Sequence, residues 1–100
     1  MTSNQTTMET EYNNNAAQLW HVDGTIEEIT PKNGESFTLK EMQKAVDGLV
    51  EMLWISETEF LLMNERGRLL WMAPNIQASL TARMLVVGPV VYIPRIELFP

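Results

Sequence analysis

The stretch formed by residues 49–72 constrains the fold most strongly, because it is almost entirely apolar or turn-forming. Polar connections divide it into three runs, residues 49–55, 60–63 and 68–72. The last two runs flank residues 64–67, whose sequence Asn-Glu-Arg-Gly suits a type I turn closed by a left-handed glycine. Residues 49–55 carry apolar side chains on both faces, which favours a central strand or a strand with one face against another subunit. The stretch therefore predicts three adjoining strands.

The clearest helix signal lies within residues 37–48. Thr38 at the N-cap and Glu41 three residues later match a capping box, and Phe37 with Met42 suits a hydrophobic staple. Gly48 stands where a glycine commonly ends a helix, at the C′ position. The predicted apolar stripe consists of Leu39, Met42, Ala45 and Val46.

A second helix is predicted after Pro74, with Asn75 as its N-cap. Its apolar face is expected to comprise Ile76, Leu80 and Met84, with the small Ala78 and Ala82 beside them. Gly88 and Pro89 interrupt the apolar run that follows, and residues 90–93 are predicted to form the final strand.

The N-terminal part divides into a polar tail and a first strand. Residues 1–17 are rich in Asn and Thr with little to bury, so we predict a disordered tail followed by a single domain over residues 18–100. Residues 19–31 read as one strand, bent or broken at Gly24. The predicted order is β-α-β-β-β-α-β, an α+β fold in which two helices pack on a mixed, mainly antiparallel sheet of about five strands.

Composition excludes several classes of function. The 100 residues carry a formal net charge of −6, which disfavours binding to nucleic acid phosphates. The absence of cysteine excludes disulfides, thiolate chemistry and Cys-based zinc sites. The sequence has no apolar run long enough to span a membrane and no signal peptide, so we expect a cytoplasmic protein that does not associate with membranes.

Residues that could carry catalysis are sparse. His21 is the only histidine, and no Ser or Asp accompanies it at the spacing of a known catalytic arrangement. The five glycines are scattered near turns and element ends and match no phosphate-binding loop. We therefore expect no enzymatic activity, no cofactor and no bound metal.

One polar cluster is a candidate binding site. It comprises Asn64, Glu65 and Arg66, together with Asn75. Loops held on a rigid sheet often carry binding residues, which favours a site here. Turn and cap chemistry alone also accounts for both asparagines, and the sequence leaves these two interpretations open.

Apolar residues in excess of what the predicted strands bury are candidates for a subunit interface. Met52, Trp54 and Trp71 lie on predicted strands whose neighbours are apolar or acidic. A base-stacking platform would combine aromatic side chains with Lys and Arg. The pattern favours a protein core or an interface in a homo-oligomer instead.

Short motifs between residues 37 and 92 carry a resemblance to a known family. The pieces are Leu39, Met42-Gln43, residues 46–51 (VDGLVE), residues 64–69 (NERGRL), Pro74-Asn75 with Ala78, Val87-Gly88 and Val90-Val91. In these pieces the chain resembles the family called domain of unknown function 3846, small proteins of bacteria, phages and mobile elements. It departs from the family pattern at Arg66, where a second acid is common, and at Pro89, where an acid often follows the late glycine. The resemblance implies no catalytic activity and a phage or mobile-element setting.

Two functions follow as hypotheses. The first is a non-enzymatic binding module, an accessory or anti-defence protein that blocks a host or defence protein, as the resemblance implies. The alternative is a protein that sequesters a small, nucleotide-like molecule near residues 64–75 or at a subunit junction. Arg66, Arg68 and Arg83 with backbone N–H groups would then hold the anion.

Overall fold

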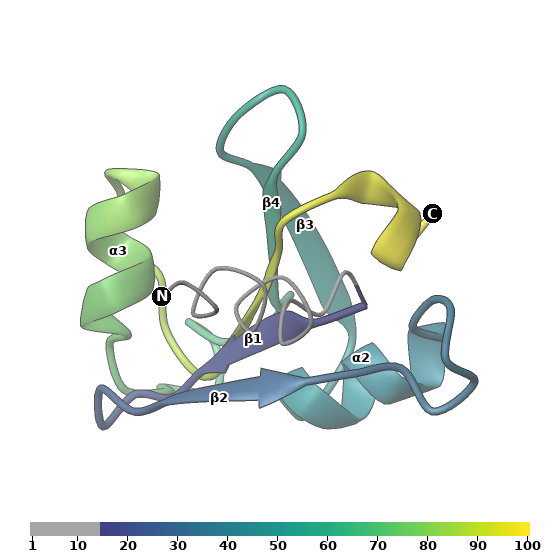
Figure 1. Ribbon diagram of the computed structural model, residues 1–100. Helices are drawn as coiled ribbons and strands as arrows, with labels where there is room; N and C mark the ends of the chain where they lie inside the picture. The colour runs from purple at the N-terminus through teal and green to yellow at the C-terminus, as the bar shows by residue number, and fades with distance from the viewer. Residues whose placement is uncertain (1–14) are drawn as a thin grey trace, which may run out of the picture.

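A computed structural model describes residues 15–100, which adopt an α+β fold (Figure 1). Five strands form one antiparallel sheet in the order β2-β1-β5-β4-β3. The strands are β1 (Ala17–Trp20), β2 (Ile26–Ile29), β3 (Val50–Trp54), β4 (Phe60–Asn64) and β5 (Val90–Ile93). The other elements are α2 (Leu39–Val46), α3 (Ile76–Ala82) and a final 3₁₀ turn, η1 (Ile96–Leu98). The predicted fold class is confirmed.

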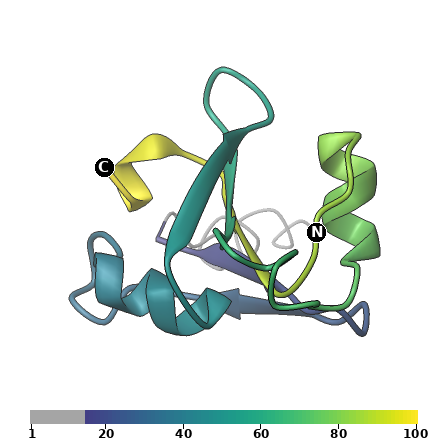
Figure 2. The same cartoon turned by 180° about the vertical axis from the view of Figure 1, so that it is seen from behind.

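The two helices pack on opposite faces of the sheet (Figures 1 and 2). Alternate residues of a strand point to opposite faces, so the core divides into two clusters. The α2 side buries Phe37, Met42, Val46, Phe60, Leu62, Val91, Ile93 and Leu98. The α3 side buries Trp20, Leu61, Met63, Ala78, Val86 and Val90. All five residues of β4 are buried, because β4 is an interior strand with a core cluster on each side.

The sheet consists of two hairpins joined by the last strand. β1 pairs with β2, β3 pairs with β4, and β5 lies between β1 and β4. β5 is therefore the element that makes the two hairpins one sheet. On the α3 side, Tyr92 of β5 stacks on Trp20 with ring centroids 5.3 Å apart and donates a hydrogen bond to Glu59. Burial, followed by this bond to a carboxylate, raises the pKa of Tyr92 to about 12.

The first predicted strand is in fact a hairpin. Gly24 adopts a φ of 94° in the turn, where His21 N–H donates to Thr25 O at 2.9 Å. The Asp23 carboxylate accepts hydrogen bonds from the hydroxyl and the backbone N–H of Thr25, which lower its pKa. The expectation of a single strand over residues 19–31 is therefore wrong, although the break falls at Gly24, as the sequence suggested. A complete turn at Gly24 reverses the chain.

The folded domain begins earlier in the chain than the predicted boundary between residues 17 and 18. Ala17, assigned to the tail by its composition, begins β1 and is buried against the α2 side of the sheet. Asn15 donates a side-chain hydrogen bond to the backbone oxygen of Gly34 at 2.5 Å. The rest of the predicted tail, residues 1–14, lies outside the described residues.

Residues 68–72, predicted as a strand, form a helical turn instead. Leu70 N–H donates to Arg66 O, Trp71 N–H to Arg68 O and Met72 N–H to Gly67 O. The last two bonds form a Schellman motif with Trp71 in the left-handed region at φ 57°. Local hydrogen bonds thus satisfy this backbone, and an apolar run without a pairing partner does not become a strand.

β3 lies at an edge of the sheet, so the interpretation of residues 49–55 as a central strand is wrong. The interior position belongs to β4, the next strand in the chain. The two apolar faces of β3 are consequently only half covered, and Met52 and Trp54 stay exposed. The other interpretation of that pattern, a face against another subunit, stays a prediction.

The start of α2 is as predicted. Thr38 Oγ1 accepts from Glu41 N–H at 3.2 Å, and Glu41 Oε1 accepts from Thr38 N–H at 2.7 Å. The other oxygen of Glu41 accepts from Lys32 N–H at 3.0 Å and so holds the preceding loop. Hydrogen bonds from the backbone N–H groups of Thr38 and then Lys32 lower the pKa of Glu41.

Replacing Glu41 with alanine is expected to lower the free energy of unfolding by about 1 kcal/mol near pH 7. The folded-state pKa lies below the unfolded value of 4.5. The stabilisation from ionised Glu41 is therefore present above pH 4.5 and is lost as the pH falls through the folded pKa. Urea unfolding of wild type and variant measures the difference, which should shrink at low pH. Lys40→Ala on the same helix is the control, and an equal loss in both variants would contradict the assigned role.

Candidate functional site

α3 packs on the sheet through its small side chains and turns its large ones to solvent. Ala78 is completely buried and Ala82 is half-buried, whereas Leu80 is 74% and Ile76 63% exposed. We expected Ile76, Leu80 and Met84 to form the apolar face of this helix, and that face is the one left uncovered. The anchoring of Asn75 at the N-cap explains the rotation, because it fixes the first turn of the helix against the sheet.

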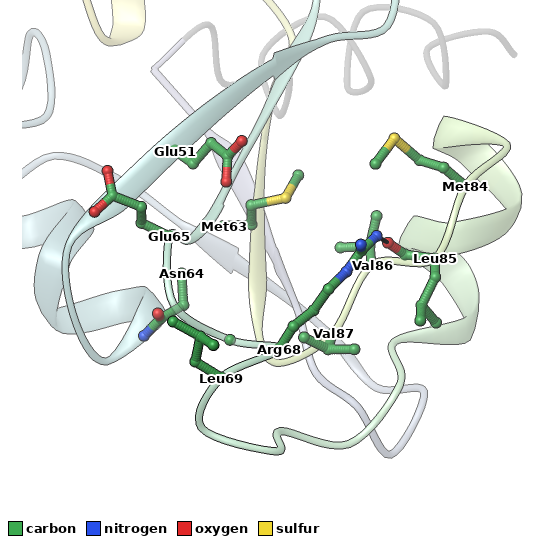
Figure 3. A pocket seen from close by; sticks show the side chains of 11 residues that line it. Glu51, Met63, Asn64, Glu65, Arg68, Leu69, Met84, Leu85, Val86 and Val87 are labelled. Atoms are coloured by element: carbon green, nitrogen blue, oxygen red, sulfur yellow. Dashed lines mark hydrogen bonds between the residues drawn. The ribbon is translucent and has the colours of Figure 1, made fainter.

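The helical turn after β4 adds further exposed apolar side chains. Leu69 is 78% exposed, and Leu70 and Trp71 are also open to solvent. Arg68 Nη2 donates to the backbone oxygen of Leu85 at 2.9 Å, which ties this turn to the segment that follows α3. Figure 3 shows the Arg68 side chain extending from the turn towards Leu85. We define the apolar surface as Leu69, Leu70, Trp71, Ile76, Leu80, Met84 and Leu85.

Trp71 is the most unusual residue of the apolar surface. It is 92% exposed and adopts a φ of 57°. A bulky side chain in the left-handed region costs about 1–2 kcal/mol relative to ordinary backbone conformations. Because the indole is almost entirely in solvent, packing within the described chain offsets little of this cost. Strain of this kind concentrates at functional positions.

A cavity of about 220 Å³ lies between the turn and the end of α3 (Figure 3). Arg68, Leu69, Met84 and Leu85 line it on the side of the apolar surface. The remaining walls come from Glu51, Met63, Asn64, Glu65, Gly67, Val86 and Val87. Two residues of the predicted binding cluster, Asn64 and Glu65, thus border one cavity. Arg66 and Asn75 do not line it.

Asn64 is buried, and internal hydrogen bonds occupy its amide. Its Nδ2 donates to Val46 O at 3.1 Å and to Asp47 O at 3.0 Å, at the end of α2. Its Oδ1 accepts from Arg66 N–H at 2.7 Å. Asp47, not Gly48, takes the left-handed position after α2, and a Cβ on Gly48 would lie only 2.6 Å from Asn64 Nδ2. Asn64 therefore joins α2 to the turn after β4.

Asn75 is completely buried and joins three parts of the fold. Its Nδ2 donates to Trp20 O and to Gly88 O, each at 2.9 Å. Its Oδ1 accepts from Ala78 N–H at 3.1 Å, as expected for an N-cap. These bonds hold the start of α3 against the end of β1 and the loop before β5. Turn and cap chemistry accounts for the bonds that the two Oδ1 atoms accept, whereas the Nδ2 groups of Asn64 and Asn75 bond to backbone oxygens far away in the chain.

The chain segment that carries the apolar surface is basic, although Glu51 and Glu65 line the cavity beside it. Residues 66–96 contain four arginines and no acidic residue, a charge of +4, whereas the other residues carry three lysines and thirteen acids. Arg66 and Arg83 are exposed next to the apolar turn and at the end of α3. Glu65 is also exposed, at the border of this segment. Dividing the chain by its secondary structure elements would have revealed this asymmetry from the sequence.

The structure places the three predicted interface residues on two separate elements. Met52 and Trp54 lie on β3, on the α2 side of the sheet, and Trp54 packs on Phe60 with centroids 4.9 Å apart. Trp71 belongs to the apolar surface. Sequence reasoning missed Leu69, Leu70 and Leu85. An apolar run adjoining turn residues does not by itself distinguish a buried strand from an exposed turn.

Two further findings concern residues 15–100 alone. They include no group of three or more His, Asp or Glu side chains that could hold a metal ion. No helix among them has the length and apolar character needed to cross a membrane.

Comparisons with known proteins add no relative. No family model matches the chain, and neither a curated protein nor a solved structure is significantly similar to it. The resemblance to domain of unknown function 3846 therefore has no support from a family model.

Proposed function

We propose that this protein is a non-enzymatic binding module that holds a protein partner on the apolar surface. The observation that carries the proposal is the orientation of α3, which buries alanines and exposes Ile76 and Leu80. A helix that only stabilised the fold would bury its largest apolar side chains. Contiguous exposed apolar patches larger than a few hundred Å² are rare on monomeric proteins and mark interaction sites.

The size of the apolar surface suits a stable complex. Its seven side chains together expose on the order of 900 Å², close to the roughly 800 Å² that each partner contributes to a standard interface. Trp71 follows Leu69 and Leu70 in the exposed turn, and tryptophans are frequent hot spots of binding energy. The surface therefore has both the area and the type of anchor that protein complexes use.

Charge defines the chemistry of the partner. Arg66 and Arg83 are exposed beside the apolar side chains, in a segment that lacks acidic residues. A partner that presents apolar anchors flanked by Asp or Glu would match this surface and would associate faster at low salt. We infer an acidic, amphipathic protein segment as the occupant.

Two other functions, an anti-defence role and the sequestration of a nucleotide-like molecule, have less support than the binding module. The anti-defence role, in which the partner is a host protein, depends on the family resemblance alone. Sequestration of a nucleotide-like molecule near residues 64–75 would require a larger site, because ligand pockets usually measure about 300–1,000 Å³ and the cavity beside Asn64 measures about 220 Å³. The polar groups of Asn64 that border the cavity are already hydrogen-bonded within the chain.

The double substitution Ile76→Gln with Leu80→Gln is expected to abolish partner binding while changing the free energy of unfolding by less than about 1 kcal/mol. Both side chains are exposed, so little packing is lost. Affinity capture from cell lysate, followed by calorimetry with each purified captured protein, measures the effect. The control replaces Val22 and Ile96, exposed apolar residues outside the apolar surface, with glutamine. Equal affinity of both double variants for every captured protein would contradict the proposal, as would binding to anionic vesicles in place of a protein.

A further inference from the structure

The free edge of β3 is a second surface, independent of the proposed binding surface. Leu49 O accepts from Glu65 N–H at 2.8 Å, and Ile55 N–H donates to Glu59 O at 3.0 Å. In an antiparallel pair, residues alternate between facing the partner strand and facing away from it. The odd-numbered residues of this stretch therefore face β4. The backbone N–H and C=O groups of Val50, Met52 and Trp54 point away from it, and no described strand pairs with them.

The two edges of the sheet differ in how they are protected. β2 presents the adjacent acids Glu27 and Glu28 at one edge. β3 has one charged residue, Glu51, among apolar neighbours, and it contains neither proline nor lysine. β3 is the outermost strand in the order β2-β1-β5-β4-β3, and in Figure 2 it lies in front of the other strands. An edge with a single charge and no proline is a template for pairing with another strand.

We propose that the occupant of this edge is β3 of a second copy, paired antiparallel about a two-fold axis at Met52. In this register Val50 lies opposite the partner's Trp54, and Met52 lies opposite the partner's Met52. The three outward-facing residues of each strand then exchange both backbone hydrogen bonds with their opposites. Two five-stranded sheets become one continuous sheet across the dimer.

The side chains favour this register over its neighbours. Glu51 lies opposite the partner's Leu53, so no like charges are directly opposed. A two-fold axis at Glu51 would place the two carboxylates opposite each other about 4.5 Å apart at Cα, which is destabilising. Axes at Val50, Leu53 or Trp54 would shorten the overlap of the strands. With the axis at Met52, Val50, Met52 and Trp54 of both copies form one apolar row across the seam on the α2 side.

The substitution Met52→Pro tests the backbone hydrogen bonds between the β3 strands of the two copies. The Met52 N–H points away from β4, so Met52→Pro removes no bond within the subunit, and proline is tolerated at such edge positions. Light scattering coupled to size-exclusion chromatography should show a dimer for wild type and for Met52→Ala. It should show dimerisation weakened about a hundredfold for Met52→Pro with an unchanged circular dichroism spectrum. A wild-type chain that stays monomeric at millimolar concentration overturns the proposal.

Single cysteines test the register, because the chain contains none of its own. Met52→Cys should form an intermolecular disulfide on mild oxidation, since opposed Cα atoms in this position lie about 5.5 Å apart. Glu51→Cys is the matched control, because in this register the two residues at 51 lie on a diagonal, beyond the roughly 7 Å that a disulfide spans. Equal crosslinking of both variants, or faster crosslinking of Glu51→Cys, overturns the proposed pairing.

The outcome is separable from that of the proposed function. Ile76→Gln with Leu80→Gln should remain dimeric, because α3 takes no part in the seam. If that double variant becomes monomeric while Met52→Pro remains dimeric, the copies associate through the apolar surface and the β3 proposal fails. Capture of a foreign strand by a wild-type chain that does not self-associate would also overturn it.

Discussion

Replacing Asn75 with alanine should lower the free energy of unfolding by about 3 kcal/mol. The substitution removes the N-cap of α3 and two hydrogen bonds from a completely buried amide to Trp20 O and Gly88 O. Each lost bond to a buried carbonyl group costs about 1 kcal/mol or more, and the missing cap costs about 1 kcal/mol. Chemical denaturation at constant pH measures the change.

Two matched variants separate the contributions of Asn75. Asn75→Ser keeps an oxygen that can cap Ala78 N–H but loses both donors, so it should recover about 1 kcal/mol relative to alanine. Asn75→Asp keeps the shape and the cap but places a carboxylate against two carbonyl oxygens, so it should be at least as unstable as alanine near neutral pH. A loss below about 1 kcal/mol in Asn75→Ala would show that the three bonds do not anchor the helix.

Replacing Trp71 with glycine should stabilise the fold and weaken partner binding at the same time. Glycine adopts the φ of 57° without steric cost, so the free energy of unfolding should rise by about 1 kcal/mol. The loss of an exposed tryptophan from the apolar surface should cost about 2 kcal/mol of binding, roughly a thirtyfold increase in Kd. Thermal unfolding and calorimetry with the captured partner measure the two effects.

Trp71→Ala distinguishes the backbone effect from the side-chain effect. Alanine keeps the left-handed strain, so stability should stay near that of wild type while binding weakens as in the glycine variant. Equal stability of the glycine and alanine variants would show that Trp71 carries no strain. Unchanged affinity in both variants would exclude Trp71 from the binding surface.

Features set by nearby residues could be predicted from the sequence. The capping box of Thr38 and Glu41 and the N-cap at Asn75 depend on residues three apart, and each forms the predicted bonds. The fold class also follows, since turn signals and apolar runs depend on local patterning. The apolar run over residues 68–72 was wrongly predicted to be a strand. A strand requires a partner strand, and β3 and β5 already occupy both positions beside β4.

The orientation of elements depends on contacts between residues far apart in the chain. Periodicity indicated two sides of α3 but not which side meets the sheet. Asn75 decides this through a bond to Trp20, which lies 55 residues earlier. Likewise, the apolar residues on both faces of β3 did not indicate that β3 lies at the edge of the sheet and β4 in its interior. Of the four residues predicted to form a binding cluster, Asn64 and Glu65 line one cavity. The exposed apolar surface beside that cavity could not be predicted from the sequence.

The position of β5 has a consequence for synthesis of the chain. β5 follows the other four described strands in the chain and so is synthesised after them, yet it occupies the middle of the sheet. The β1–β2 and β3–β4 hairpins emerge earlier, and until β5 arrives each presents an open inner edge with its apolar face uncovered. Such intermediates are prone to aggregate. We therefore expect the chain to be prone to aggregation until β5 pairs with β1 and β4.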